Sequence, residues 1–190
     1  MIRMREDLSL VRVFVAIDFP DEVIKEVARV QELIGKRNFT GKFTELENLH
    51  LTLKFLGEIE EEKVEMVKNS LREIKFGKFE VKLGNIGVFH FRKEPKIVWI
   101  KIFGKKIYDL QKEIDSALEK EGFFREERFM GHLTIARVKY VKDKNGFEEH
   151  IKKINVKGIG FMINNFKLMK SELKGQGPVY IVLEEYGVRR

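Results

Sequence analysis

The sequence predicts an α+β protein with antiparallel β-sheets, arranged as two similar lobes. Helical patterns number three or four, against seven or more strand patterns that mostly follow one another as in hairpins. The order strand, helix, strand occurs twice, and each time the second strand contains His-Leu-Thr. No linker or low-complexity segment interrupts the 190 residues, so we expect one domain of two lobes over residues 1–190.

The first half of the chain contains two predicted helices. It begins with a strand over residues 10–19, which is rich in β-branched residues. Apolar residues then recur at helical spacing over residues 23–34, before a glycine. A short strand near residues 43–46 leads to the run "HLTLKFL", which we expect to end at Gly57. A second helix over residues 60–75 is acidic at its start and bears lysines later, as the helix dipole favours.

The second half begins with two strands of period-two alternation that are predicted to pair antiparallel. Its predicted elements are strands over residues 78–89 and 96–103 joined by a loop with Pro95, a helix over residues 107–118, the second His-Leu-Thr strand, a short helix over residues 146–153, and strands near residues 156–170 and 178–185 on either side of the turn "KGQGP".

The two His-Leu-Thr segments, "NLHLTLKF" at residues 48–55 and "MGHLTIAR" at residues 130–137, are the strongest functional signal. The chain has only four histidines and four threonines, so chance predicts about 0.1 His-x-Thr pairs where two occur. Side chains two residues apart on a strand share one face. Each strand therefore presents one imidazole and one hydroxyl together.

Two histidines that face one cleft indicate general acid–base catalysis. Imidazole titrates near neutral pH, so one ring can accept a proton while the other donates one. A displacement at phosphorus needs both steps, and threonine hydroxyls can bind the non-bridging oxygens. The sequence has no His-Glu-x-x-His motif or other obvious metal-binding cluster, so we expect neither a metal nor another cofactor.

Composition limits the partners and the location of the protein. The net charge of +7 favours a polyanionic partner such as RNA, although lysine-rich surfaces also serve solubility alone. The absence of cysteine excludes a disulfide-stabilised secreted domain. Without an apolar run that could span a membrane or form a signal peptide, we expect a cytoplasmic protein. The 35% of charged residues favours a heat-adapted organism.

With its paired motifs the chain resembles the 2H phosphoesterase superfamily, and most closely its bacterial and archaeal RNA 2′,3′-cyclic phosphodiesterases, also called 2′-5′ RNA ligases. The resemblance implies a bilobal fold with pseudo-two-fold symmetry, in which two antiparallel sheets flank a central cleft and helices pack outside. We expect a monomer. The stretches that carry the resemblance are "RVFVAID" (12–18), "NLHLTLKFLGE" (48–58), "HLTIARVK" (132–139) and "KSELKGQGPVY" (170–180).

The resemblance also implies a reaction, the opening of a 2′,3′-cyclic phosphate at an RNA end to leave a 2′-phosphomonoester. It makes His50 the proton donor and His132 the proton acceptor, a division that the residues themselves leave open. Thr52, Thr134 and Arg137 would bind the phosphate. Arg137 lies five residues after His132, an odd offset that requires a bulge or a reach around the strand end.

Four further residues are candidate contacts for RNA. Arg12 and Phe14 share one face of the first strand, where Phe14 could stack on a base or fill the core. Lys54 could meet an RNA phosphate or be solvated. Tyr180, near the end of the last matching stretch, is a similar case. Many relatives carry proline before the second histidine, where Gly131 could loosen the entry to the strand.

Two other functions are compatible with these residues. The same histidines could join RNA ends, such as tRNA halves, through a 2′-5′ bond, because acid–base catalysis serves both directions. A nucleotide-dependent ligase would usually carry a phosphate-binding motif, and neither a Walker P-loop nor Gly-x-Gly-x-x-Gly is present. A non-catalytic protein that binds RNA ends is the second alternative, and it would not require two histidines.

Overall fold

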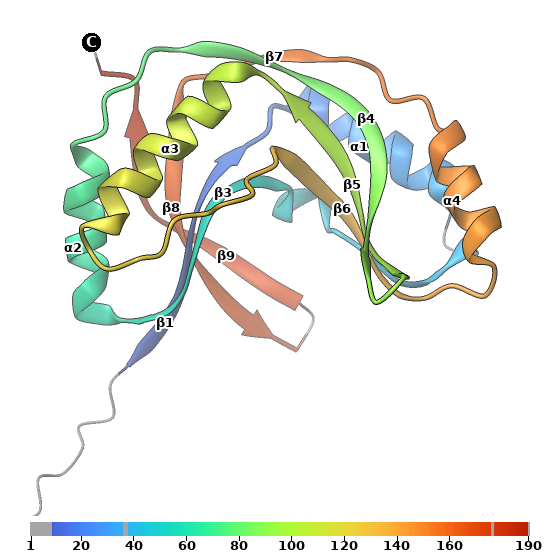
Figure 1. Cartoon of the computed structure of the whole chain (residues 1–190), viewed down its shortest axis with the longest axis horizontal. Coiled ribbons are helices and arrows are strands. Elements are labelled where there is room, and N and C mark those ends of the chain that lie inside the picture. The colour runs from blue at the N-terminus through green and yellow to red at the C-terminus, as the bar shows by residue number, and fades with distance from the viewer. Residues whose placement is uncertain (1–8, 36–37, 176, 190) are drawn as a thin grey trace, which may run out of the picture.

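The computed structural model describes residues 9–35, 38–175 and 177–189, which form two antiparallel sheets and four α-helices (Figure 1). This confirms the predicted α+β class. The elements are β1 (Leu10–Asp18), α1 (Asp21–Ile34), β2 (Thr40–Phe43), a 3-10 turn η2 (Leu46–Asn48), β3 (His50–Glu60), α2 (Glu61–Arg72), β4 (Phe79–Phe91), β5 (Glu94–Phe103), α3 (Lys105–Glu119), β6 (His132–Tyr140), α4 (Lys144–Lys153), β7 (Gly160–Ile163), β8 (Asn165–Lys174) and β9 (Gly177–Gly187).

Each sheet contains one of the His-Leu-Thr strands. The four-stranded sheet has the order β3-β1-β8-β9, and the five-stranded sheet has the order β2-β6-β5-β4-β7. Strands β3 and β6 contact each other across the junction of the two sheets. The helices lie outside, with α2 and α3 beside the first sheet and α1 and α4 beside the second (Figure 1). Because α1 follows β1 but packs on β6, and α3 follows β5 but packs on β3, each sheet is covered in part by a helix that follows a strand of the other sheet.

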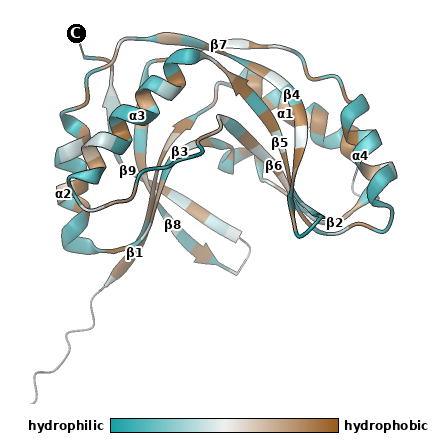
Figure 2. Cartoon of the chain, viewed as in Figure 1, coloured by the Kyte–Doolittle hydropathy of each residue, from teal (hydrophilic) through white to brown (hydrophobic). Residues whose placement is uncertain are grey.

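The core forms where the apolar faces of the strands meet the helices. Val13, Val15 and Ile17 of β1 are buried in the main core, as the alternation of that strand predicts. On the opposite face, Phe14 and Ala16 belong to a separate small cluster with Met169. Figure 2 shows hydrophobic colour along much of the strands and a mixture of hydrophilic and hydrophobic colour along the helices. The second face of β1 therefore lies toward the space between the lobes.

Two predictions about the segment before and within β3 are wrong. The strand expected near residues 43–46 ends earlier, as β2, and is followed by the turn η2. Gly57 does not end β3, which continues to Glu60. The φ of Gly57 is 79°, a conformation open to glycine, and the pairing with β1 shifts register there. A glycine at this position supports a bulge instead of stopping the strand.

The β4–β5 hairpin is tighter than expected. Arg92 and Lys93 form its two-residue turn, both with positive φ, which matches the twist of paired strands. Pro95 lies within β5 instead of in the loop. Residues 156–170, expected as one strand, contain β7 and the first part of β8. The turn "KGQGP" includes Gln176, which lies outside the described residues.

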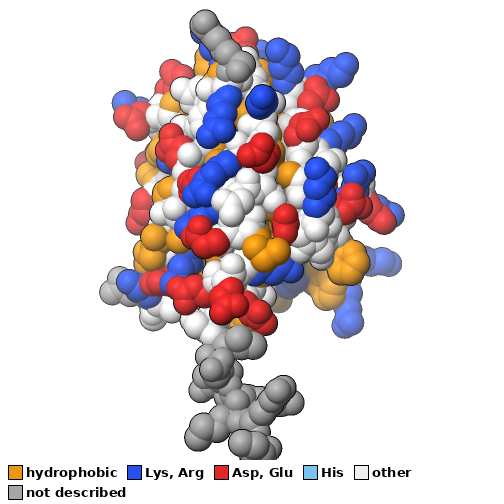
Figure 3. Space-filling view, turned by 90° about the vertical axis from the view of Figure 1, so that its left-hand side faces the viewer, with side chains coloured by type: hydrophobic (Ala, Val, Ile, Leu, Met, Phe, Trp, Pro, Cys, Tyr) orange, Lys and Arg blue, Asp and Glu red, His pale blue; other side chains and the backbone are white. Residues whose placement is uncertain are grey.

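Charged side chains of both signs are mixed on one side of the molecule. Figure 3, which views the side at the left of Figure 1, shows basic and acidic side chains interspersed. The net charge of +7 is therefore not gathered into one basic patch on this face. Within the described ranges, no helix has both the length and the apolar character needed to cross a membrane.

Lys54 of β3 forms a buried ion pair with Asp115 of α3, and the two side chains are 4% and 7% exposed. The ammonium also donates to the carbonyl of Phe124 at 2.7 Å. The carboxylate accepts from the backbone N–H of Glu126 at 3.0 Å and from the Gln111 amide at 2.7 Å. The pair thus fastens the loop before β6 to the first lobe. Enclosed in this way, Lys54 is not available to an RNA phosphate, which corrects that prediction.

Replacing Lys54 alone will leave the Asp115 carboxylate buried without its counter-charge. We expect Lys54→Met to lower the free energy of unfolding by about 3–5 kcal/mol, measured by denaturant titration. The double variant Lys54→Met/Asp115→Leu will lose less, because no isolated charge remains. Lys25→Met on the exposed side of α1 is the control, expected within about 0.5 kcal/mol of the wild type. A Lys54→Met protein as stable as this control would contradict the assignment.

Candidate active site

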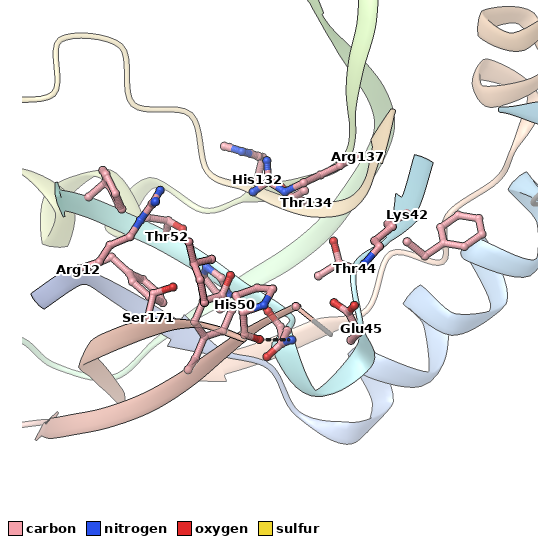
Figure 4. A pocket seen from close by; sticks show the side chains of 18 residues that line it. Arg12, Lys42, Thr44, Glu45, His50, Thr52, His132, Thr134, Arg137 and Ser171 are labelled. Atoms are coloured by element: carbon pink, nitrogen blue, oxygen red, sulfur yellow. Dashed lines mark hydrogen bonds between the residues drawn. The ribbon is translucent and has the colours of Figure 1, made fainter. Parts of the chain in front are cut away.

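A cavity of about 450 Å³ lies between the two sheets and is lined by both His-Leu-Thr motifs. His50 and Thr52 reach it from β3, and His132 and Thr134 reach it from β6 (Figure 4). The structure thus brings two pairs of side chains together. Each pair comes from one strand, and the two strands lie about eighty residues apart in the sequence. The volume falls in the range of small-molecule binding sites.

Backbone carbonyls fix the orientation of both imidazoles. His50 Nδ1 lies 2.8 Å from the carbonyl oxygen of Asn48, and His132 Nδ1 lies 2.7 Å from that of Met130. A carbonyl can only accept, so each Nδ1 must carry the proton. The neutral form of each ring then has an unprotonated Nε2. That atom can accept a proton and, once protonated, can donate one.

The surroundings lower the pKa of both rings. Burial is the largest cause for each, because desolvation disfavours the charged imidazolium. For His50, the hydrogen bond to Asn48 and the charge of Asp18 act in the opposite direction, while Arg137 and His132 lower its pKa further. For His132, the hydrogen bond to Met130 raises the pKa and the charge of Lys101 lowers it. Both rings are therefore poised as neutral bases near pH 7.

Aromatic rings pack against both imidazoles. The centroid of the His50 ring lies 4.9 Å from that of Phe14 and 5.0 Å from that of Tyr180. The His132 ring lies 5.1 Å from Phe89. Phe14 is only 3% exposed, so it packs mainly within the small cluster and against His50, in line with core filling. Tyr180 is partly exposed and lines the cavity, and burial raises the pKa of its phenol.

A β-bulge follows the first motif. In the pairing of β1 with β3, Ala16 lies opposite Thr52 and Val15 lies opposite Lys54, so Leu53 has no partner in β1. An unpaired residue reverses the alternation of faces after it. Lys54 therefore points into the interior instead of continuing the face of Thr52.

The second motif carries a bulge at the same position. Trp99 pairs with Thr134 and Val98 pairs with Ala136, so Ile135 is the unpaired residue. The bulge turns Arg137 toward the cavity, which provides the geometry that its odd offset required. The residue at the same offset from His50 is Phe55, which lines the cavity too. Applying the Arg137 reasoning to the first motif would have identified Phe55 from sequence.

Arg12 and Phe55 form one end of the cavity. The Arg12 guanidinium carbon lies 4.9 Å from the centroid of the Phe55 ring, a cation–π geometry. Ser171, paired with Arg12 across β1 and β8, lines the same end. Of the candidate RNA contacts, Arg12, Phe14 and Tyr180 therefore line the cavity, and Lys54 does not.

Sequence reasoning missed four other lining residues, namely Lys42, Thr44, Glu45 and Asn48, and the first three lie at the end away from Arg12 (Figure 4). They lie on β2 and in the segment up to η2, where the sequence pattern predicted a strand at the wrong place. The side chain of Asn48 donates to the Pro178 carbonyl at 3.1 Å. This bond ties η2 to the start of β9, close to Tyr180.

Gly131 does not loosen the entry to β6. The backbone N–H of Ile102 donates to the Gly131 carbonyl at 2.9 Å, so this residue is fastened to β5. A Cβ added at Gly131 would lie 3.2 Å from the Ile102 carbonyl oxygen, and the backbones therefore approach closely. The segment that positions His132 is thus held in place. Within the residues that the structure describes, no group of three or more side chains is suited to hold a metal ion.

Comparison with known proteins agrees with the fold and the motifs. The family model for LigT-like phosphoesterases matches residues 17–99 and 101–180 in two segments. A Methanocaldococcus jannaschii protein named RNA 2′,3′-cyclic phosphodiesterase is 36% identical over 92% of this chain and 99% of its own. A Thermotoga maritima protein of the same name is 36% identical over 92% of this chain and 94% of its own.

Solved structures show the same fold. A crystal structure of a Thermus thermophilus protein superposes with a TM-score of 0.82 at 27% identity, covering 94% of this chain and 98% of that one. Escherichia coli LigT in complex with 3′-AMP superposes with a TM-score of 0.74 at 21% identity, covering 96% of this chain and all of its own. At that identity the second likeness concerns the fold alone.

The protonation of the two rings can be measured without a substrate. In ¹H–¹⁵N spectra of the imidazoles at pH 7.5, we expect both His50 and His132 as the Nδ1–H tautomer. Both should titrate below the ordinary value of about 6.5, because burial lowers their pKa. Spectra of His50→Gln and His132→Gln assign the signals. An Nε2–H tautomer, or a midpoint above 6.5 for either ring, would contradict this description.

Proposed function

The chain belongs to the family of LigT-like phosphoesterases, and from this we propose that it hydrolyses 2′,3′-cyclic phosphates at RNA ends to 2′-phosphomonoesters. One observation carries the proposal. Two histidines, each with its Nδ1 proton held by a carbonyl, line the same cavity with two threonines. This is the set of groups that a two-proton displacement at phosphorus needs. The two lobes would act as one domain around this cavity, which is lined by strands of both sheets.

In the proposed reaction a water molecule attacks the phosphorus of the cyclic phosphate. His132 Nε2 accepts a proton from the water as the new P–O bond forms. The bond from phosphorus to the 3′ oxygen breaks, and His50 Nε2 donates its proton to that oxygen. Thr52, Thr134 and Arg137 hold the non-bridging oxygens and stabilise the negative charge there. The products are a 2′-phosphomonoester and a 3′-hydroxyl, with His50 and His132 having exchanged protonation states.

The charges around the two rings support this division of roles. Asp18 is the nearby charge with the largest effect on His50, and it favours the protonated form that an acid requires, against burial and the smaller effects of Arg137 and His132, which lower the pKa. Lys101 is the charge that acts on His132, and it favours the neutral form that a base requires. The reverse roles would operate if the chain joined RNA ends, since the displacement then runs in the opposite direction.

Removing either histidine should abolish hydrolysis. We expect His50→Ala and His132→Ala each to lower kcat by about 10²–10⁴-fold, because each removes one proton transfer. The assay uses a short RNA with a 2′,3′-cyclic phosphate end in the presence of a chelator, followed by identification of the product. The wild type should give the 2′-phosphate at a rate that the chelator does not change.

His90→Ala is the matched control for these variants, because His90 is exposed and pairs with Glu148 away from the cavity. It should retain wild-type activity, and circular dichroism should show all three variants folded. Full activity in either cavity variant would refute the mechanism. A wild type that shows no turnover and binds RNA as tightly as the two histidine variants do would favour a binding protein. A 3′-phosphate product would refute the proposed bond cleavage.

The pH dependence of hydrolysis follows from the direction of the two pKa shifts. The active form has one protonated and one neutral ring, and in the free protein both pKa values lie below about 6.5. Above 6.5 the acid is lost, and far below it the base is lost. The optimum of kcat/KM should therefore lie below pH 6.5. A bound anionic phosphate raises both pKa values, so the optimum of kcat should lie at higher pH. Coincident optima above pH 7 would contradict this.

A further inference from the structure

Glu45 is the one carboxylate among the described residues that line the cavity. The other charged side chains there are the cations Arg12, Lys42 and Arg137. Within the part of the chain that the structure describes, no Lys, Arg or His nitrogen lies within 4.0 Å of the Glu45 carboxylate. A negative charge in a cavity for an anionic phosphate repels the substrate, so this carboxylate calls for an explanation.

The backbone around Glu45 is held from several sides. The N–H of Thr44 donates to the carbonyl of Ile135, the bulge residue of β6, at 3.0 Å. The side chain of Gln31 donates to the Thr44 carbonyl at 2.8 Å. The carbonyl of Glu45 accepts from the N–H of Asn48 at 2.9 Å as η2 begins. Glu45 is therefore on a fixed support beside the second motif, which is what a recognition residue requires.

The proposed substrate limits what this carboxylate can bind. At an RNA end with a 2′,3′-cyclic phosphate, the 2′ and 3′ oxygens of the terminal ribose are both esterified, and its 5′ oxygen continues the chain. The terminal sugar therefore has no hydroxyl. A carboxylate can only accept hydrogen bonds. The hydrogen-bond donors of the terminal nucleotide are then those of its base.

We propose that Glu45 recognises the Watson–Crick edge of the terminal base and makes the enzyme prefer guanine. Guanine presents two adjacent donors, N1–H and N2–H, which match the two oxygens of a carboxylate. Adenine and cytosine present one amino group each. Uracil presents one N–H between two carbonyl oxygens, which repel a carboxylate. Lys42 lines the same end of the cavity and is suited to donate to O6 of guanine.

The two ends of the cavity differ in the way this proposal needs. In Figure 4, Glu45, Thr44 and Lys42 lie on one side of His50, and Arg12 lies on the other. Arg12 packs on Phe55, and both line the cavity. The end with Arg12 therefore suits the 5′ phosphate of the terminal nucleotide, and the end with Glu45 suits its base.

This inference rests on the proposed function, so the experiment separates the two. kcat/KM is measured with the wild type and Glu45→Gln for four short RNAs that end in a 2′,3′-cyclic phosphate and differ only in the terminal base (guanosine, adenosine, cytidine or uridine), so that the terminal sugar has no hydroxyl. We expect the wild type to favour guanosine over uridine by roughly tenfold to a hundredfold, the effect of a hydrogen bond to a charged group. In Glu45→Gln, guanosine should lose most of this advantage and uridine should gain, because an amide offers one donor and one acceptor.

Glu47→Gln is the matched control, because Glu47 is an exposed acid on η2 that does not line the cavity. It should keep the wild-type order of bases. Binding of the same four RNAs is measured in parallel, so that the base order is tested even if no cyclic phosphate is opened. A wild type without base preference in binding and turnover would overturn the inference. So would a Glu45→Gln variant that changes all four bases by the same factor.

Discussion

Each imidazole in the cavity donates its Nδ1 proton to the carbonyl two residues before it, His50 to Asn48 and His132 to Met130. This hydrogen bond decides which nitrogen can exchange protons with a substrate, and it depends on how the chain enters each strand. Much of the surrounding structure serves these two entries. Asn48 is held to the start of β9 by its side chain, and Gly131 is held to β5 by its carbonyl. Among the described residues neither Nδ1 has a carboxylate partner, so backbone geometry sets the tautomers.

The two lobes use the same backbone device with different side chains. A bulge one residue after each threonine turns the fifth residue after the histidine toward the cavity. In the second lobe this residue is Arg137, a cation suited to phosphate, and in the first it is Phe55, which supports Arg12. The residue before this position is buried in both lobes. It is Lys54 in the first lobe, which pairs with Asp115, and Ala136 in the second. The same bulge in two strands therefore produces an asymmetric site.

The alternation of residues along the sequence predicted which side chains share a strand face. It could not predict contacts between side chains of elements that lie far apart in the sequence. The period-two face of β1 and the paired faces of the motifs follow from alternation, so Arg12, His50 and His132 could be placed from sequence. A bulge breaks that alternation and depends on the neighbouring strand, which is why the sequence predicts Lys54 to be solvated or at an RNA phosphate although it pairs with Asp115 on α3. The end of the cavity around Glu45 was missed because turn η2 has no periodic signal.

In the proposed mechanism, the negative charge of the bound substrate changes the protonation of the two histidines. Burial and the charges of Arg137 and Lys101 disfavour imidazolium, so the free protein keeps both rings mainly neutral near pH 7. A bound phosphate brings the negative charge that stabilises a protonated ring, and Asp18 biases that proton toward His50. Cations that bind the phosphate and a protonated acid would otherwise repel each other. In the proposed mechanism, the anion between them resolves this conflict, so that the acid–base pair would be completed on binding.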